Sequence, residues 1–202
     1  MNSAVRVKDT SPDALRHVFA NLRECDRAEL DATNYSLDPD DQTERLMGLA
    51  TFQFAAYVGE TPAAIIGAWP RWPGVWGVYA FGTDEFPGRS LTKFARRVMV
   101  PALLEAGAHR AECASLGSHW RAHQWLERLG AKREAILRGY GKNRETFYLY
   151  AWTAERVQRP ARGRRLTPPL RTEPSRGRAS ARCRGPATGA DHARLQVREH
   201  PV

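Results

Sequence analysis

Apolar residues along this chain fall in blocks whose spacing predicts both strands and helices. The run Val75–Phe81 is short, apolar and β-prone, and the loop Gly82–Gly88 after it has glycine at both ends. From Leu91 onward, apolar residues recur three and four positions apart, which is the repeat of an amphipathic helix. Ser90 is the predicted N-cap of this helix, and Gly107 is its predicted end.

A second strand and helix follow at once. Residues 108–116 predict a strand, and Ser118 is the predicted N-cap of a helix over 119–129. A strand–helix–strand unit of this length favours a parallel strand pair with a right-handed crossover. Ligands of such units bind where strands end and helices begin, so we expect a site at Phe81–Thr92 and Leu116–Trp120.

The N-terminal part predicts one short strand followed by helices. Val5–Val7 alternates like a strand, and Ser11-Pro12-Asp13 combines a capping serine, a proline and a first-turn acid, as at a helix start. We expect this helix to run to about Ala32. Asp38-Pro39-Asp40 repeats the start signal for a shorter second helix.

Further strands surround the strand–helix–strand unit. Phe52–Val58 and Ala63–Trp69 are joined by a short Gly/Pro turn and predict a hairpin, which Val75–Phe81 extends to an antiparallel meander. After Gly130, two more strands are predicted over 132–138 and 145–152. The fold class is therefore α/β (α+β): a mixed sheet with an antiparallel N-terminal meander, a parallel central strand pair and about four flanking helices.

Charge divides the chain into two parts. The net charge is +9, but residues 154–202 hold 12 Arg, no Lys and 4 acids, and residues 1–153 are close to neutral. Arg, Pro, Gly and Ser dominate the later part without any sustained period, so we predict a domain over 1–153 and a disordered basic tail over 154–202. Such a tail attracts phosphates, so weak nucleic-acid binding is an expected property of the tail alone.

The cysteines, histidines and hydropathy give no prediction of a metal site, a membrane span or a signal peptide. Cys25, Cys113 and Cys183 form no CxxC pair, and His119 and His123 have helical metal-ligand spacing without a third ligand, so no metal site is predicted. No apolar run approaches the roughly 20 residues that span a bilayer. With no signal-peptide pattern at the N-terminus, a cytoplasmic protein without membrane contact is the expectation.

The order of predicted elements resembles the GNAT superfamily, the acyl-CoA-dependent N-acyltransferases. The resemblance covers roughly residues 4–153 and includes the strand–loop–helix pattern at Val78–Arg97 and the helix with a Leu129-Gly130 ending. It implies acetyl-CoA as co-substrate, with its pyrophosphate at a helix N-terminus, and an amine acceptor that is a small molecule or a protein. Phe86–Thr92, at the place of the family's glycine-rich phosphate loop, has one glycine, and Leu126 stands where a tyrosine acid is frequent.

Within this superfamily, the chain resembles GNAT-like phage and prophage proteins related to an internal core protein of T7-type phages. The likeness rests on Trp76, the Phe94–Arg97 run, His123 and Leu22–Asp26. It implies a second hypothesis, in which the chain is a non-catalytic virion-associated or interaction protein that contacts virion proteins.

The resemblance assigns candidate site residues. The acids nearest the expected cleft include Glu112, which with Ser118 is a candidate catalytic residue. The expected CoA-binding residues are the end of the central strand, whose backbone contacts the thioester carbonyl, and the start of the next helix: Tyr79, Ala80, Phe81, Gly82, Pro87, Gly88, Arg89, Ser90, Leu91 and Thr92.

Overall fold

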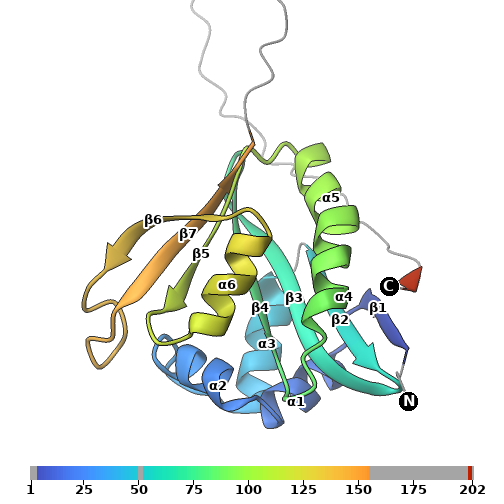
Figure 1. Ribbon diagram of the computed structural model, residues 1–202. Coiled ribbons are helices and arrows are strands. Elements are labelled where there is room, and N and C mark those ends of the chain that lie inside the picture. The colour runs from blue at the N-terminus through green and yellow to red at the C-terminus, as the bar shows by residue number, and fades with distance from the viewer. Residues whose placement is uncertain (1–3, 50–51, 155–199, 202) are drawn as a thin grey trace, which may run out of the picture. The chain divides into compact units, whose positions relative to one another are not determined.

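One mixed sheet runs through the protein, with helices on both of its faces. The computed structural model describes residues 4–49, 52–154 and 200–201. The strands lie in the order β6-β7-β5-β4-β3-β2-β1-β8. All described pairs are antiparallel except β4 and β5, so the predicted meander and parallel pair are confirmed. Figure 1 shows β4 and β5 close together at one end of the sheet and diverging toward the other.

The strands and helices lie close to their predicted positions. The strands are β1 (Val5–Asp9), β2 (Phe52–Val58), β3 (Thr61–Trp72), β4 (Val75–Gly82), β5 (Arg110–Leu116), β6 (Lys132–Leu137), β7 (Phe147–Thr153) and β8 (His200–Pro201). The helices are α1 (Pro12–Ala20), α2 (Glu24–Asp31), α3 (Pro39–Leu49), α4 (Gly88–Phe94), α5 (Val100–Glu105) and α6 (Trp120–Arg128). A π-helical segment, η1 (Ala95–Met99), joins α4 to α5.

Three local predictions were wrong. The first helix does not continue to Ala32, because Asn21 leaves helical geometry and a separate α2 begins after Arg23. Ser90 is not an N-cap, since α4 begins at Gly88 without a side-chain cap, and Ser90 lies in its first turn. Ser118 is likewise not the cap of α6, whose N-cap position is His119.

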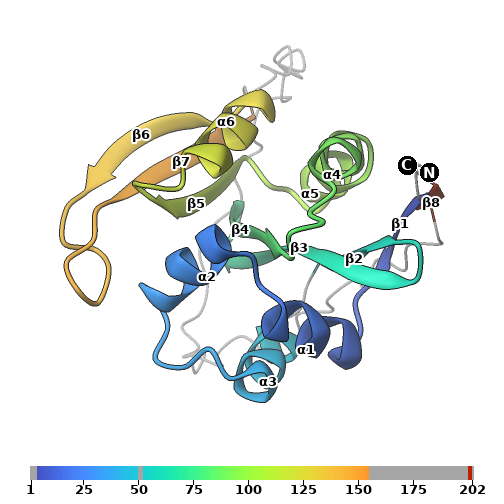
Figure 2. The same cartoon turned by 60° about the horizontal axis from the view of Figure 1, so that its bottom comes forward.

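Each face of the sheet has its own core. Figure 2 shows α1, α2 and α3 on one side of the sheet and α4, α5 and α6 on the other. On the first side, α1 residues pack with Leu46 of α3 against Ala55, Ile65 and Phe81. On the second, Leu91, Phe94 and Met99 pack against β-strand residues such as Phe54. Burial of both helix sets fixes the sheet between them.

The basic tail lies almost wholly outside the described residues. The exception is β8, a two-residue strand that pairs antiparallel with β1. Within the described part of the chain, no helix is long and apolar enough to cross a membrane.

Candidate acyl-transfer site between β4 and β5

The parallel pairing of β4 and β5 is short. It covers only Val75–Gly77 against Arg110–Glu112, although both strands continue beyond these residues. A cleft of about 170 Å³ lies where they separate. Its lining is mostly apolar and comes from β3, β4, β5, β7, α2, the η1–α5 segment and α6. A small parallel ladder that opens into an apolar cleft gives a linear ligand two strand edges to lie between.

The backbone of β4 shows which groups face this cleft. The N–H of Gly82 donates to Asp26 Oδ2 at 2.7 Å and its carbonyl accepts from Arg23 N at 3.0 Å, whereas Thr83 N–H donates to Ala63 of β3. Strand residues alternate in direction, so Val78 and Ala80 turn their backbone groups to the same side as Gly82. Tyr79 and Phe81 turn theirs to β3.

The β5 edge is built in the same way. Leu116 N–H donates to Glu29 Oε2 at 2.8 Å, and the Leu116 carbonyl accepts from His123 Nε2 at 2.9 Å. Gly117 N–H, in contrast, donates to Thr146 beside β7. By the same alternation, the backbone groups of Ala114 face the cleft. Side chains therefore cap the far ends of both edges, and Val78, Ala80 and Ala114 provide backbone groups between these caps and the short ladder.

The start of α4 lies next to the end of β4. Leu91 N–H donates to Pro87 O at 3.0 Å, which is the first intrahelical bond, so Arg89 and Ser90 N–H have no internal acceptor. A Cβ added at Gly88 would have Phe86 as its nearest neighbour, at 3.6 Å. This open helix start provides backbone donors of the kind that bind phosphates.

Trp125 of α6 connects α6 to the start of α4. Its indole Nε1 donates to Thr92 Oγ1 at 2.9 Å, and Thr92 Oγ1 in turn donates to Gly88 O at 2.7 Å. The Trp125 ring also meets Phe86 edge-on, with ring centroids 5.8 Å apart. These contacts hold α6 against the start of α4, and Trp125 also lines the cleft.

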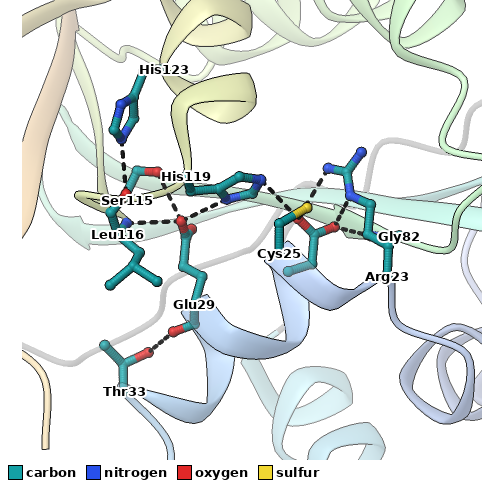
Figure 3. A network of polar contacts seen from close by, with 10 residues as sticks. Arg23, Cys25, Glu29, Thr33, Gly82, Ser115, Leu116, His119 and His123 are labelled. Atoms are coloured by element: carbon teal, nitrogen blue, oxygen red, sulfur yellow. Dashed lines mark hydrogen bonds and ion pairs between the residues drawn. The ribbon is translucent and has the colours of Figure 1, made fainter. Parts of the chain in front are cut away.

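A polar network joins α2, β5 and α6 beside the cleft (Figure 3). Glu29 Oε2 accepts from Ser115 Oγ at 2.8 Å and from Leu116 N, and it lies 2.9 Å from His119 Nδ1. His119 is 5% exposed, and its Nε2 lies 3.5 Å from Asp26 Oδ1. We call Asp26, Glu29, Ser115 and His119 the α2–α6 network.

Within the α2–α6 network, Asp26 is a structural residue that links α2 to β4. It is 3% exposed and receives Arg23 Nε at 2.8 Å and Nη2 at 3.0 Å as well as the Gly82 N–H. Burial raises its pKa, and the bonds from Arg23 and Gly82 oppose this rise without cancelling it. Because Arg23 and Gly82 take up the Asp26 carboxylate, Asp26 joins α2 to the end of β4.

The predicted catalytic residues lie in different settings. Glu112 lines the cleft, but its carboxylate forms ion pairs with Arg71 and Arg110. Burial would raise the pKa of Glu112, but hydrogen bonds from Arg110 and Arg71 outweigh it and lower the pKa below the ordinary 4.5. Ser118 is exposed and is not among the residues that line the cleft. The structure brings Glu112 to the site and leaves Ser118 beside it.

Two other titratable side chains in the cleft are held neutral. Burial raises the pKa of Tyr79 to about 12, and Gln53 Nε2 donates to its hydroxyl at 2.6 Å. Burial also raises the pKa of Cys113 to about 12, so its thiol is not a nucleophile near neutral pH. Leu126 lines the cleft at the position where the resemblance implied a tyrosine.

Among the described residues, one group of side chains has the spacing of metal ligands, but its surroundings disfavour a metal ion. Cys25 Sγ, Asp26 Oδ1 and His119 Nε2 lie within 4.8 Å of one another. However, the Arg23 guanidinium occupies both Asp26 oxygens, which disfavours a second cation there. His123, the other histidine with helical ligand spacing, binds the Leu116 carbonyl instead.

Comparison with known proteins places the fold. No protein-family model matches the sequence, and no curated protein matches it significantly. Among solved structures, an acetyltransferase (GNAT family) from Bacillus anthracis superposes with a TM-score of 0.59 at 12% identity, covering 76% of this chain and 96% of that one. The domain has the GNAT fold.

Two further structures with the GNAT fold add detail. A ribosomal-protein-alanine N-acetyltransferase from Brucella melitensis has a TM-score of 0.60 at 11% identity, covering 73% of this chain and 99% of that one. A ribosomal L7/L12 alpha-N-protein acetyltransferase in complex with coenzyme A has a TM-score of 0.59 at 9% identity, with 75% and 94% covered. Identities this low establish a shared fold, so the activity has to be argued from the site.

Of the site residues predicted from sequence, Tyr79, Ala80 and Glu112 line the cleft, whereas Phe81, Gly82 and residues 87–92 are not among its lining residues. Sequence reasoning missed the α2–α6 network. Asp26 and Glu29 stand three residues apart on α2, so both can lie on one helix face. That spacing was the only sign in the sequence that the two carboxylates act together. It does not reveal that β5 and the start of α6, about 90 residues later in the chain, pack against this face of α2.

Proposed function

We propose that this chain is an acetyl-CoA-dependent N-acetyltransferase that acts on an amine. The observation that carries the proposal is the cleft between β4 and β5, where Val78 and Ala80 turn unpaired backbone groups toward an apolar space. A pantetheine arm is a linear chain with two amides, so it fits such an edge as an added strand would. The cofactor residues predicted from sequence belong to the end of β4 and to the start of α4.

The strand alternation divides the predicted cofactor residues by role. Ala80 N–H faces the cleft and is the donor we assign to the thioester carbonyl. The backbone groups of Tyr79 and Phe81 pair with β3, and Gly82 N–H is bound to Asp26. These three residues therefore have no free backbone N–H for the cofactor and would contact it only by van der Waals packing. An N–H aimed at the carbonyl stabilises the charge that develops when an amine attacks.

The first turn of α4 is the proposed pyrophosphate site. It offers the N–H groups of Arg89 and Ser90, with Pro87, Gly88, Leu91 and Thr92 shaping the turn. The exposed Arg89 side chain adds positive charge. The single glycine at position 88 is where a phosphate can approach the backbone closely, because glycine has no Cβ.

The acceptor remains defined only as an amine. Two of the solved structures with this fold are described as acetyltransferases of ribosomal proteins, which makes a protein amine a suitable first class to test beside small amines. The structural neighbours reported above are acetyltransferases, so they favour the enzyme over a virion-associated protein without catalysis.

Calorimetric titration of the full chain with acetyl-CoA tests the proposal. We expect saturable binding, at least tenfold weaker in Gly88→Glu, because a carboxylate at the helix start repels phosphate and fills the open space above residue 88. Gly48→Glu is the matched control, since Gly48 is exposed on α3 and a Cβ there meets nothing within 4 Å. Absence of binding at millimolar acetyl-CoA, in protein shown to be folded, would refute the proposed function.

A further inference from the structure

Glu29 is the carboxylate that enters the cleft from the side of α2. It lines the cleft, and its side chain is 24% exposed, whereas its partner His119 is almost fully buried. All three contacts of its carboxylate involve the same oxygen, Oε2. Within residues 4–49, 52–154 and 200–201, no hydrogen bond involves Oε1. One oxygen is therefore fixed by the protein, and the other is left to accept from a bound molecule.

The partners of Glu29 hold the carboxylate in one orientation. Ser115 Oγ and Leu116 N are both 2.8 Å from Oε2 and come from β5, the strand that forms one edge of the cleft. His119 Nδ1, at 2.9 Å, comes from the start of α6 and faces an oxygen that can only accept, so Nδ1 carries a proton. Figure 3 shows the Glu29 side chain reaching up from α2 to these three groups.

The other charged groups around Glu29 are already paired or neutral. Asp26, on the same helix, is bound to Arg23, and Glu112 on β5 is bound to two arginines. The Cys113 thiol is neutral because burial raises its pKa to about 12. Burial lowers the pKa of His123, whose Nε2 binds the Leu116 carbonyl. Of these carboxylates, Glu29 alone keeps an oxygen without a protein partner inside the cleft.

We infer that Glu29 is the general base of the proposed acetyl transfer and binds the acceptor as an ammonium ion, and that His119 positions it. Glu29 Oε1 accepts one proton from the ammonium, which leaves a neutral amine. The amine nitrogen then forms a C–N bond to the thioester carbonyl carbon, and the C–S bond breaks. The leaving CoA thiolate takes the second amine proton, and Glu29 releases the first to solvent, so the reaction gives the amide, CoA thiol and one proton.

This inference rests on the proposed function, and it adds a substrate class to it. The acceptor is a primary amine that arrives protonated, since a neutral acceptor would not need a carboxylate at this position. The amine enters from the α2 side while the cofactor enters from the α4 side, so the two substrates approach the thioester from different faces of the sheet.

Acetyl transfer by the full chain tests the inference. The probes are acetyl-CoA with three acceptors: a short peptide with a free N-terminus, a lysine peptide with a blocked N-terminus, and spermidine. Acetylated product is measured by mass spectrometry. We expect Glu29→Gln to lower kcat about 100-fold, within the usual range for a general base, and to leave the acetyl-CoA Kd within about twofold. Glu24→Gln is the matched control, because Glu24 is exposed on the same helix.

His119 is tested by substitution with rescue. The side-chain amide of His119→Asn can place an N–H near the position of Nδ1, so we expect it to retain most of the activity, whereas His119→Ala loses about tenfold in kcat with little change in KM. A pH profile adds a second readout. Glu29→Gln removes the ionisable base, so we expect its kcat/KM to follow the free amine alone and its pH profile to differ from that of wild type.

The possible results separate the inference from the proposed function. Wild-type transfer with unchanged kcat and an unchanged pH profile in Glu29→Gln overturns the inference and leaves the acetyltransferase standing. Absence of acetyl-CoA binding in wild type overturns both. Binding of acetyl-CoA without transfer to any of the three amines overturns the inference, because all three are ammonium ions at neutral pH.

Discussion

Carboxylates in this protein differ in function according to what surrounds each oxygen. Asp26 is bound on both oxygens by Arg23 and Gly82, and Glu112 by Arg71 and Arg110. The guanidinium groups of Arg71 and Arg110 lower the pKa of Glu112 and make it a weak base. Burial raises the pKa of Asp26, but Arg23 and Gly82 take up both of its oxygens. Glu29 has neutral backbone and hydroxyl donors and an imidazole on one oxygen only. The same residue type therefore stabilises the fold in one place and is suited to proton transfer in another.

Glu112→Gln is expected to affect stability more than turnover. The substitution removes charge from a 9% exposed carboxylate and leaves Arg110 and Arg71 without it, so we expect the free energy of unfolding to fall by about 1–3 kcal/mol at neutral pH. The pKa of Glu112 is lowered in the folded state, so this stabilisation is present above its ordinary 4.5 and is lost as the pH falls through the folded-state pKa.

Urea unfolding of wild type and Glu112→Gln across pH checks this expectation. The difference between the two proteins should shrink as the pH is lowered from about 6 toward 3. A difference that stays constant over that range would show that charge is not its origin. A 100-fold loss of kcat with unchanged stability would instead support the original assignment of Glu112 as a catalytic residue.

At the scale of elements, α2 and α6 connect the two parts of the sheet across the cleft. Asp26 binds the end of β4 and Glu29 binds the end of β5, although the two strands share only a three-residue ladder. Most elements were predictable because the hydrophobic period of a strand or helix is local in sequence. The break between α1 and α2 was not, since it depends on Asn21 N–H and side-chain bonds to the preceding turn.

The candidate site divides in the same way. The cofactor side that we propose, from Tyr79 to Thr92, is contiguous in sequence and was predicted from a strand–loop–helix pattern. The Glu29–His119 contact joins residues 90 positions apart, so it depends on how α2 packs beside β5. Ser118 drew attention as a helix cap, but the turn after β5 places His119 at that position and leaves Ser118 exposed.

The end of β4 is expected to tolerate no side chain at Gly82. A Cβ there would lie 2.4 Å from the Ala63 carbonyl oxygen and 2.8 Å from the Phe86 ring. The carbonyl belongs to the backbone of β3 and cannot rotate away, so Gly82→Ala should lower the free energy of unfolding by about 1–3 kcal/mol. Gly88→Ala, whose nearest neighbour is at 3.6 Å, is the control and should change it by less than about 0.5 kcal/mol.

Chemical denaturation of both glycine variants gives the comparison. Equal stabilities would mean that β4 can shift away from β3 at little cost. In that case the strand would not hold Ala80 in a fixed position, and the assignment of its N–H to the thioester carbonyl would lose its basis.

At the scale of the whole molecule, charge and catalysis are assigned to different parts of the chain. Residues 1–153 carry almost no net charge, while residues 154–202 carry 12 Arg against 4 acids. The proposed site draws on β3, β4, β5, α2, α4 and α6, all within the first part. A strongly basic pI is therefore no guide to what the cleft binds, and polyanion binding and acetyl transfer should be separable.

Affinity for polyanions is expected to reside in the basic tail. Full-length protein should elute from heparin at a higher salt concentration than residues 1–154, because several arginines release counterions when they meet phosphate or sulfate groups. On single-stranded nucleic acid, the logarithm of the binding constant should fall linearly with the logarithm of the salt concentration, and this slope should flatten in the truncated protein. A variant with the tail arginines changed to serine keeps the chain length and is the control for loss of β8. Equal retention of full-length and serine-substituted proteins would place the polyanion site on the domain, where the exposed Arg89, Arg96 and Arg97 on the α4–η1 segment would be the next residues to substitute.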